Sequence, residues 1–440
     1  MKNIGIKNII TGVFVVGALF GFLIFSGAID VGNDTQEARG SVIVWGTTDA
    51  QKMQPYIDLT KNQNLTVTYY QKQTATYENE LINAFASGSG PDLFIMPHEN
   101  ILRHSDKVLE IPYASFTKDL YESTYIDEAR LFLTDTGVTA FPLTVDPLIM
   151  YYNKALISSA FILDVPQYWD EFAEFSNAIT RYNGTGEVSI AAAALGTYDN
   201  VINSKAIMSA LILQNGNSIV GTDSRDSTKF SLLSSSGETQ VKTNQALDFY
   251  TSFSDFGSDT YSWNEALVDS RNKFIAGELA LYFGRASEVQ DIRRKNPNLD
   301  FSAELLPQVR GNTIKLTQGA MMGIGISKQS KNINGSIAVA STMAGSVIAD
   351  GLAVELQVAP ARKDLLRNKP EDAFKTLVYN SAIISRGWID PDPEKSSTIF
   401  RTMLRNINTG ALSVSASVDR ANADLDTLLD QTINIAIKSR

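Results

Sequence analysis

The sequence predicts an α/β fold that is divided into at least two lobes. Strand-like and helix-like segments alternate along the chain after an apolar N-terminal segment, a pattern typical of parallel sheets covered by helices. The chain has 440 residues, which is more than a single hydrophobic core normally serves. Its hydrophobic content of 44% and charged content of 20% are those of an ordinary globular protein.

The first part of the folded chain alternates most regularly. Residues 41–46 predict a strand, because Val42, Ile43 and Val44 are β-branched. Four further segments follow in the order helix, strand, helix, strand. They cover residues 49–62, 65–72, 76–90 and 91–97.

The middle and the end of the chain are more helical. Residues 166–182 predict a helix, because Trp169, Phe172, Phe175 and Ile179 recur at helical spacing. We expect strands within residues 190–197, 279–289 and 311–327, and helices within residues 243–256, 264–278 and 332–353 and in the C-terminal tail. Residues 222–240 are polar and predict a surface insertion.

Composition excludes several classes of function. The net charge is −10 and no long basic block is present, which argues against nucleic-acid binding. The absence of cysteine excludes disulfides, thiolate metal sites, a cysteine nucleophile and a lipidated N-terminal cysteine. His98 and His104 do not have a metal-ligand spacing. Asp390, Asp392 and Glu394 alternate as in a calcium loop but lack its glycine, so we expect a solvated turn, no metal and no cofactor.

The N-terminus predicts a membrane segment. Lys2 and Lys7 precede an uncharged stretch from Asn8 to Ile29. An apolar run of about 20 residues can span a bilayer, whereas the core of a signal peptide is usually about 7–15 residues long. The lysines would keep the N-terminus in the cytoplasm. We expect an anchor over residues 1–29 and a linker over 30–40, which places the remainder outside the cell membrane; the alternative is a long signal peptide and a secreted or periplasmic protein.

Seven phrases occur in an order that resembles one protein family. They are "VIVWGTTD", "FASGSGPDLFIMPHEN", "FPLTVDPLIMYYNKALI", "VPQYWDEF", "FIAGELALYFG", "LTQGAMMGIGIS" and "QVAPARKDLL". Together they resemble extracellular solute-binding protein family 1 of ABC transporters, the sugar-binding, maltose-binding-protein-like branch. The resemblance covers roughly residues 41–430.

The resemblance implies a two-lobe periplasmic-binding-protein (Venus-flytrap) fold, with a hinge and a ligand cleft between the lobes. The chain of such a fold crosses between the lobes more than once. We expect lobe one to comprise residues 41–145 plus 308–350, and lobe two to comprise residues 146–307 plus 351–437.

The resemblance also places candidate ligand-binding residues in lobe one. Trp45, Thr47, Thr48 and Asp49 follow the first strand, and the alternative for this loop is a helix cap beside a half-buried tryptophan. Two further candidates, His98 and Glu99, follow the "PDLFIMP" strand. The alternative for the histidine is a surface loop residue. A carboxylate at Glu99 could accept two sugar hydroxyls, although Met96 stands where the family has an aromatic residue.

The remaining candidates come from the hinge and from lobe two. Asp146 matches an acidic hinge-edge position, and its alternative partner is a backbone amide of the hinge. Gln318 could line the floor of the cleft, unless its segment only packs backbone tightly. The other candidates fall where the family places cleft residues or a stacking aromatic: Tyr198, Phe283, Arg285 and Trp388.

The function that the resemblance implies is solute capture without catalysis. The chain would be a monomeric, membrane-tethered substrate-binding subunit that delivers a sugar or oligosaccharide to the permease of an ABC importer. One alternative is a non-sugar solute such as a polyamine, which the acidic candidates would tolerate. A second is an extracellular carbohydrate-active enzyme using paired acids such as Glu99 and Asp146, although no nucleophile motif or phosphate-binding loop supports it. A sensory subunit would have the same sequence features.

Overall fold

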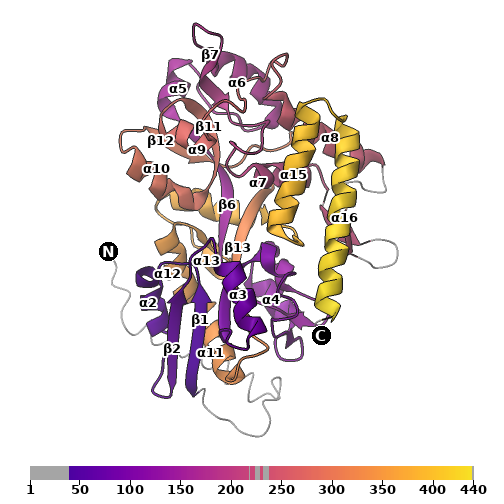
Figure 1. Cartoon of the computed structure of the whole chain (residues 1–440). Helices are drawn as coiled ribbons and strands as arrows, with labels where there is room; N and C mark the ends of the chain where they lie inside the picture. The colour runs from indigo at the N-terminus through magenta and orange to yellow at the C-terminus, as the bar shows by residue number, and fades with distance from the viewer. Residues whose placement is uncertain (1–38, 218, 223–227, 231–236, 439–440) are drawn as a thin grey trace. The chain divides into compact units, whose positions relative to one another are not determined.

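The computed structural model describes residues 39–217, 219–222, 228–230 and 237–438 (Figure 1). The predicted anchor, nearly all of the linker at residues 30–40 and much of the polar insertion at residues 222–240 lie outside the described residues. Within the described ranges, no single helix has the length and apolar composition to cross a membrane, although one bent pair, α11 (Ile333–Met343) and α12 (Ser346–Leu356), meets both criteria together.

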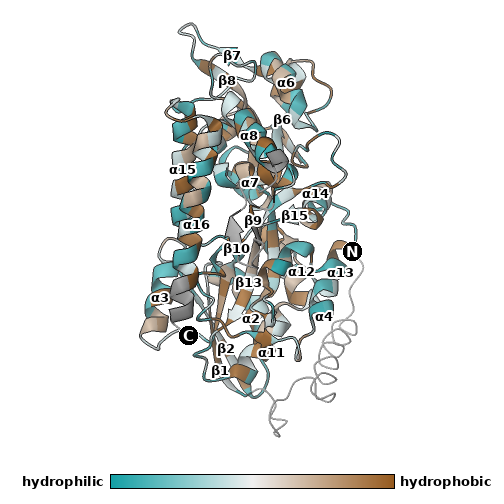
Figure 2. Cartoon of the chain, turned by 90° about the vertical axis from the view of Figure 1, so that its right-hand side faces the viewer, coloured by the Kyte–Doolittle hydropathy of each residue, from teal (hydrophilic) through white to brown (hydrophobic). Residues whose placement is uncertain are grey.

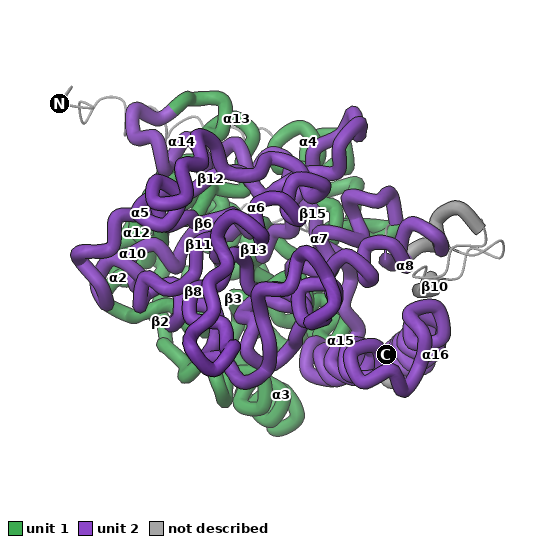
Figure 3. Tube along the Cα trace, turned by 90° about the horizontal axis from the view of Figure 1, so that it is seen from above, with its two compact units in different colours: residues 1–145, 321–369 green, residues 146–320, 370–440 purple. Residues whose placement is uncertain are grey.

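The chain forms two compact units, which are coloured separately in Figure 3. Unit 1 comprises the residues up to Val145 and residues 321–369, and unit 2 comprises residues 146–320 and 370–440. The second and third boundaries lie further along the chain than residues 308 and 350, where we expected them. Two of the three crossings occur inside continuous strands, β6 (Phe141–Asn153) and β13 (Thr317–Ile326).

Unit 1 is built on a sheet of the order β2–β1–β3–β13. The strand β1 (Gly40–Gly46) runs parallel to β2 (Leu65–Gln71) and β3 (Leu93–Pro97), whereas β13 is antiparallel to β3. Val42 and Val44 are fully buried on β1, as the β-branched run predicted. The helices α2 (Ala50–Asp58) and α3 (Tyr77–Ala86) connect these parallel strands.

The helices α11 and α12 of unit 1 correct one prediction. We expected a single helix over residues 332–353, but the chain bends by 60° between α11 and α12. Gly345 caps α12 at this break, and a side chain there would come within 2.9 Å of the Thr342 carbonyl oxygen. Both helices pack inside unit 1, α11 against β1 and α12 against α2. Their apolar composition therefore matches the burial of Val339 and Leu352.

The smaller elements of unit 1 connect these parts. They are η1 (His98–Asn100), β4 (Ile111–Pro112), α4 (Lys118–Thr124), η2 (Asp127–Phe132), β5 (Gly137–Val138), β14 (Ala359–Pro360) and α13 (Lys363–Leu366).

Unit 2 has a mixed sheet around the second half of β6. The strand β11 (Leu279–Arg285) runs antiparallel to β6 and parallel to β8 (Val188–Ala193), and β12 (Phe301–Glu304) pairs with the far end of β6. The other elements of unit 2 are α5 (Lys154–Ser159), η3 (Trp169–Glu171), α6 (Phe172–Ile179), β7 (Arg181–Tyr182), α7 (Ser204–Gln214), β9 (Val220–Thr222), β10 (Thr228–Phe230), α8 (Gly237–Ser252), α9 (Ser270–Ile275), η4 (Ala286–Glu288), α10 (Val289–Lys295), α14 (Ala373–Ile383), β15 (Ser385–Arg386), α15 (Pro393–Asn408) and α16 (Val414–Lys438).

Aromatic rings fill the core of unit 2. The ring of Trp169 lies 5.2 Å from Phe172 and 5.7 Å from Phe283 between centroids. All four residues that predicted the helix over 166–182 are buried. The helices α15 and α16 pack side by side, and Figure 2 shows hydrophilic and hydrophobic residues alternating along both. Their buried residues, such as Phe400 and Leu425, face the interior of the unit, as expected of amphipathic helices.

Candidate functional site

The carboxyl ends of β1, β2 and β3 meet at one edge of the unit 1 sheet because the three strands are parallel. We call residues 45–49, 71–72 and 97–100 the unit 1 edge. In open α/β sheets, ligands bind outside the carboxyl ends of the strands. The structure therefore brings the six lobe-one candidates to one edge of one sheet.

Trp45 carries a cation on one face of its indole. The Lys72 ammonium lies 3.6 Å from the ring centroid, and the same ammonium lies 3.1 Å from a carboxylate oxygen of Glu80. A cation over an indole face is an attractive arrangement. This face is therefore occupied, and only the other face or the edge of Trp45, which is half-buried, is left for a ligand.

The loop after β1 combines a helix cap with free hydroxyls. Asp49 caps α2, because its Oδ1 accepts hydrogen bonds from the amides of Gln51 at 2.9 Å and Lys52 at 3.3 Å. This cap is the alternative that we considered for the loop. The hydroxyls of Thr47 and Thr48, by contrast, make no hydrogen bond to any residue that the structure describes, although both residues are half-buried.

His98 is buried and keeps an unpaired donor. Only 1% of the residue is exposed, so the surface-loop alternative is wrong. Its Nδ1 accepts the amide of Met321 at 3.2 Å, which assigns the ring proton to Nε2. That Nε2 is buried and has no partner among the described residues. Glu99 beside it is half-buried and engaged in other contacts, and Met96 lies in the core.

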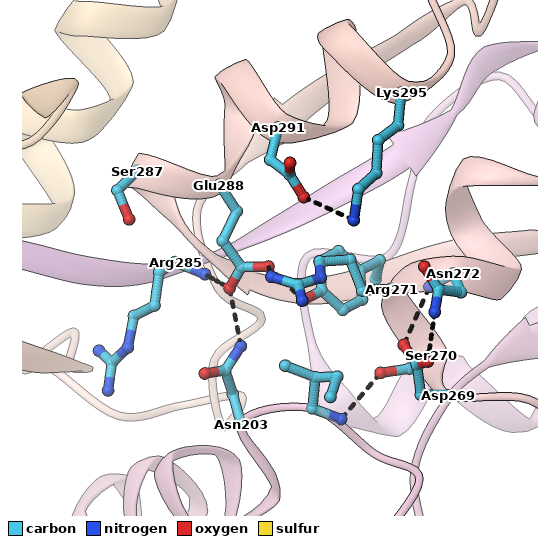
Figure 4. Close-up of polar contacts among 12 residues, drawn as sticks. Asn203, Asp269, Ser270, Arg271, Asn272, Arg285, Ser287, Glu288, Asp291 and Lys295 are labelled. Atoms are coloured by element: carbon cyan, nitrogen blue, oxygen red, sulfur yellow. Dashed lines mark hydrogen bonds and ion pairs between the residues drawn. The ribbon is translucent and has the colours of Figure 1, made fainter. Parts of the chain in front are cut away.

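A second group of polar residues lies at one edge of the unit 2 sheet. The parallel strands β8 and β11 end at the edge where the antiparallel β6 enters the unit. We call Asp146, Asn203, Arg285, Ser287 and Glu288 the unit 2 edge; Figure 4 shows the last four. Two of the lobe-two candidates, Asp146 and Arg285, thus lie together.

Asp146 holds a carboxyl group with an unusual pKa. Its two oxygens accept hydrogen bonds from the Ser287 amide at 3.1 Å and the Ser287 hydroxyl at 2.5 Å. Burial of the carboxyl group raises its pKa to about 6, although the nearby Arg285 guanidinium and the Ser287 hydrogen bonds act in the opposite direction. The residue as a whole is half-buried, so a solute could still reach it.

Arg285 and Glu288 are fixed by hydrogen bonds within unit 2. The Arg285 Nη1 donates to the carbonyl oxygens of Asp146 at 3.0 Å and Gln318 at 3.2 Å. Glu288 accepts the amide of Arg285 at 2.9 Å and the Asn203 side chain at 3.0 Å. Figure 4 shows the Arg285 guanidinium extending away from the Glu288 carboxylate. The Gln318 side chain is buried, and its Oε1 has no partner in the described chain.

Two of the predicted aromatic candidates, Phe283 and Trp388, lie inside unit 2 instead. Phe283 is 1% exposed and packs against the core rings of Trp169 and Phe172. Trp388 is 4% exposed, and its Nε1 donates to the Ser209 hydroxyl at 3.1 Å. Neither ring presents a free face, because neighbours from distant parts of the sequence cover it. The cleft position expected of Phe283 and the stacking role expected of Trp388 are therefore corrected to packing inside unit 2.

Tyr198 is less buried than Phe283 and Trp388. It is half-buried, and the Arg401 guanidinium lies 4.9 Å from its ring centroid. Burial raises the pKa of its hydroxyl, against a hydrogen bond with Ser397. Tyr198 follows β8, so it is the aromatic residue of lobe two that remains a candidate for ligand contact.

The acidic "DPDPE" segment is not a solvated turn. Asp390 is fully buried and pairs with Lys205 and with the Ser396 hydroxyl. Asp392 caps α15 by accepting the amides of Glu394 and Lys395 at 3.2 Å each. Among the residues that the structure describes, no group of three or more histidine, cysteine or acidic side chains could hold a metal ion.

Sequence reasoning missed four residues that make the contacts of these edges, Lys72, Asn203, Ser287 and Glu288. Lys72 directly follows the second strand, a position that could have drawn attention to it. Ser287 and Glu288 follow the "YFGR" phrase, but their hydrogen bonds to Asp146 and Asn203 connect residues far apart in the sequence. Local patterns carry no signal for such pairs.

A model of the bacterial extracellular solute-binding protein family matches residues 57–375. A curated relative, the maltotriose-binding protein of Pyrococcus abyssi (strain GE5 / Orsay), is 28% identical over 149 residues. This match covers 32% of this chain and 31% of the relative, so the chain spans about a third of the relative's length.

Solved structures extend the similarity to nearly the whole chain. A cyclo/maltodextrin-binding protein complexed with maltotetraose has a TM-score of 0.70 at 14% identity, over 91% of this chain and 99% of its own. The sugar-binding protein of Xanthomonas citri has a TM-score of 0.69 at 17% identity, over 90% and 99%. An ABC substrate-binding protein of Listeria monocytogenes in complex with cycloalternan has 0.67 at 16%, over 89% and 99%. These likenesses confirm the predicted two-lobe α/β fold.

Proposed function

Because the chain belongs to the family of bacterial extracellular solute-binding proteins, we propose that it is the substrate-binding subunit of an ABC importer. It binds a sugar or oligosaccharide and delivers it to the membrane permease. The observation that carries this proposal is the pair of Thr47 and Thr48 hydroxyls at the unit 1 edge. Both residues are half-buried, and neither hydroxyl makes a hydrogen bond to any residue that the structure describes.

The chemistry of these groups suits a carbohydrate. A sugar presents hydroxyls that both donate and accept, and threonine hydroxyls do the same. Asp146 at the unit 2 edge adds a carboxylate acceptor, and Tyr198 adds an aromatic ring. The curated relative is named for maltotriose, and one similar structure holds maltotetraose, which supports a malto-oligosaccharide as the first solute to test.

The same edge disfavours the polyamine alternative. A polyamine bound against Trp45 would place its ammonium groups near the Lys72 ammonium, which already lies over the indole. Two ammonium groups held close together repel each other. A neutral polyol does not meet this repulsion, so sugar is favoured over a cationic solute at this position.

The proposed function involves no chemical step. The protein would bind its solute, close around it and dock on the permease, as solute-binding proteins do. The family places this folded part outside the cytoplasm. We propose that residues 1–29 hold it at the membrane and that residues 30–40 form the tether.

A thermal-shift screen over malto-oligosaccharides, monosaccharides, polyamines and amino acids tests the proposal. A solute at one hundred times its Kd stabilises the folded state by about 2.7 kcal/mol. We expect a malto-oligosaccharide to raise the melting temperature of the wild type and to lose this effect in T47V/T48V. The control T66V/T68V changes two exposed threonines on β2 of the same unit and should respond like the wild type. A shift with polyamines alone would contradict the proposal.

A further inference from the structure

Arg285 lies where the two strands that connect the units enter unit 2. The boundaries fall between Val145 and Asp146 on β6, and between Ala320 and Met321 on β13. Arg285 is the last residue of β11 and pairs with Leu148 of β6. The β11 ladder therefore ends two residues before β6 reaches the boundary.

Just beyond the end of this ladder, the Arg285 side chain makes hydrogen bonds to the connecting strands. Its Nη1 carries two N–H groups, and the two acceptors are the carbonyl oxygens of Asp146 and Gln318, at 3.0 and 3.2 Å. One acceptor belongs to β6 and the other to β13. A single guanidinium nitrogen thus joins the backbones of both connecting strands, each within three residues of its boundary.

The backbone of Arg285 and the Asp146 side chain are held in place by the rest of the unit 2 edge. The Arg285 amide donates to Glu288, which also accepts the Asn203 side chain (Figure 4). Ser287 donates two hydrogen bonds to the carboxylate of Asp146, which lies on β6. The strands β6 and β13 are also hydrogen-bonded neighbours in the sheet, and the Thr317 hydroxyl donates to the Leu148 carbonyl oxygen at 2.6 Å.

We propose that Arg285 is a positioning residue that clamps β6 and β13 together at the base of the hinge, rather than a ligand contact. A charge-assisted hydrogen bond to backbone is stronger than a neutral one, so the clamp stiffens both strands where they leave unit 2. Bending on closure is then confined to the part of the strands beyond the clamp.

The clamp predicts a distinctive effect on binding, and this part of the inference rests on the proposed function. A ligand contact changes the affinity of the solutes that touch it. A clamp acts on the conformational equilibrium, so it changes the affinity for every solute by a common factor. It also acts in the absence of solute, which a ligand contact does not.

The test is hydrogen exchange of the full chain without any solute, followed by mass spectrometry of peptides that cover residues 144–149 and 316–320. We expect Arg285→Met to accelerate exchange in both peptides on the order of tenfold, the change that the loss of a charged hydrogen bond produces. Arg285→Lys should lie between Arg285→Met and the wild type, because a lysine can still donate to a carbonyl oxygen. It also provides a readout if the methionine variant does not fold.

Arg271→Met is the matched control. Arg271 lies 3.8 Å from the Glu288 carboxylate in the same cluster, and none of its described bonds reaches β6 or β13, so it should leave exchange in both peptides unchanged. Titration of two different saccharides then gives the affinities, whose ratio should stay constant in Arg285→Lys.

If both Arg285 variants exchange amide hydrogens in the two peptides at the wild-type rate, the proposed clamp is overturned. If one saccharide loses affinity and another does not, Arg285 is a ligand contact and the clamp is again overturned. A wild type that binds no saccharide counts against the proposed function instead, and the solute-free exchange still decides the clamp.

Discussion

Trp388 shows at the residue scale what burial does to a predicted ligand contact. Its indole is packed inside unit 2 and bonded to Ser209. Truncation of a buried tryptophan to alanine costs about 3–5 kcal/mol. We expect Trp388→Ala to lower the free energy of unfolding by this amount in urea denaturation. Trp388→Phe, which keeps most of the ring volume, should cost clearly less. A Trp388→Ala variant with wild-type stability and lost solute affinity would restore the stacking role.

Asp146 predicts a dependence of stability on pH. Burial raises the pKa of its carboxyl group to about 6 in the folded protein, whereas a carboxyl group in an unfolded chain titrates near 4. The folded state therefore binds the proton more tightly, so the stabilisation that the proton provides is complete below pH ~4 and lost as the pH rises through ~6. Asp146→Asn cannot lose this proton.

The measurement compares the two proteins without solute. We expect the free energy of unfolding of Asp146→Asn, relative to the wild type, to increase steadily in urea denaturation between pH ~4 and pH ~7. Taking the difference removes the other titrating groups, which both proteins share. A difference that does not change with pH would show that the Asp146 carboxyl group titrates normally.

The candidate residues show which positions can be predicted from local sequence and which cannot. The position of Thr47–Asp49 at the end of a strand was predictable, because the β-branched run before it marks β1. The burial of Phe283 and Trp388 was not predictable, because the groups that cover them, such as Trp169 and Ser209, lie far away in the sequence. Family position alone suggested cleft contacts that packing does not permit.

At the element scale, variants of Asp49 at the start of α2 can distinguish a capping role from solute binding. Asp49 caps this helix through two backbone amides. Replacing such a cap by alanine costs about 0.5–2 kcal/mol, whereas asparagine caps as well as aspartate. We expect Asp49→Ala to lose stability and Asp49→Asn to keep it in thermal denaturation. If Asp49 also binds solute, Asp49→Asn will weaken binding at unchanged stability; equal binding by both proteins would limit Asp49 to the cap.

Most elements were predictable from periodicity, and the exceptions have identifiable causes. The strand at residues 41–46 is β1, and the aromatic spacing at 166–182 marks α6. The helix over 332–353 is broken because Gly345 begins a new helix, and a small residue in a small-residue run gives no clear stop signal. The boundaries of the units depend on contacts between distant segments, which periodicity does not contain.

At the scale of the whole molecule, the proposed N-terminal anchor predicts in which cell fraction the protein is found. If residues 1–29 are an uncleaved anchor, the full chain should sediment with membranes and resist alkaline carbonate extraction. A chain that starts at Arg39 should remain in the supernatant with the same solute affinity. Recovery of the full chain in the soluble fraction with a shortened N-terminus would instead identify a cleaved signal peptide.

Titration calorimetry of the wild type with maltotriose and longer malto-oligosaccharides tests the central claim most directly. We predict saturable single-site binding with a Kd in the micromolar range, which corresponds to about −8 kcal/mol. Binding should weaken at least about tenfold in T47V/T48V, a change of about 1.4 kcal/mol, and persist in T66V/T68V. The absence of binding heat with every saccharide, together with saturable heat from a polyamine, would contradict the account.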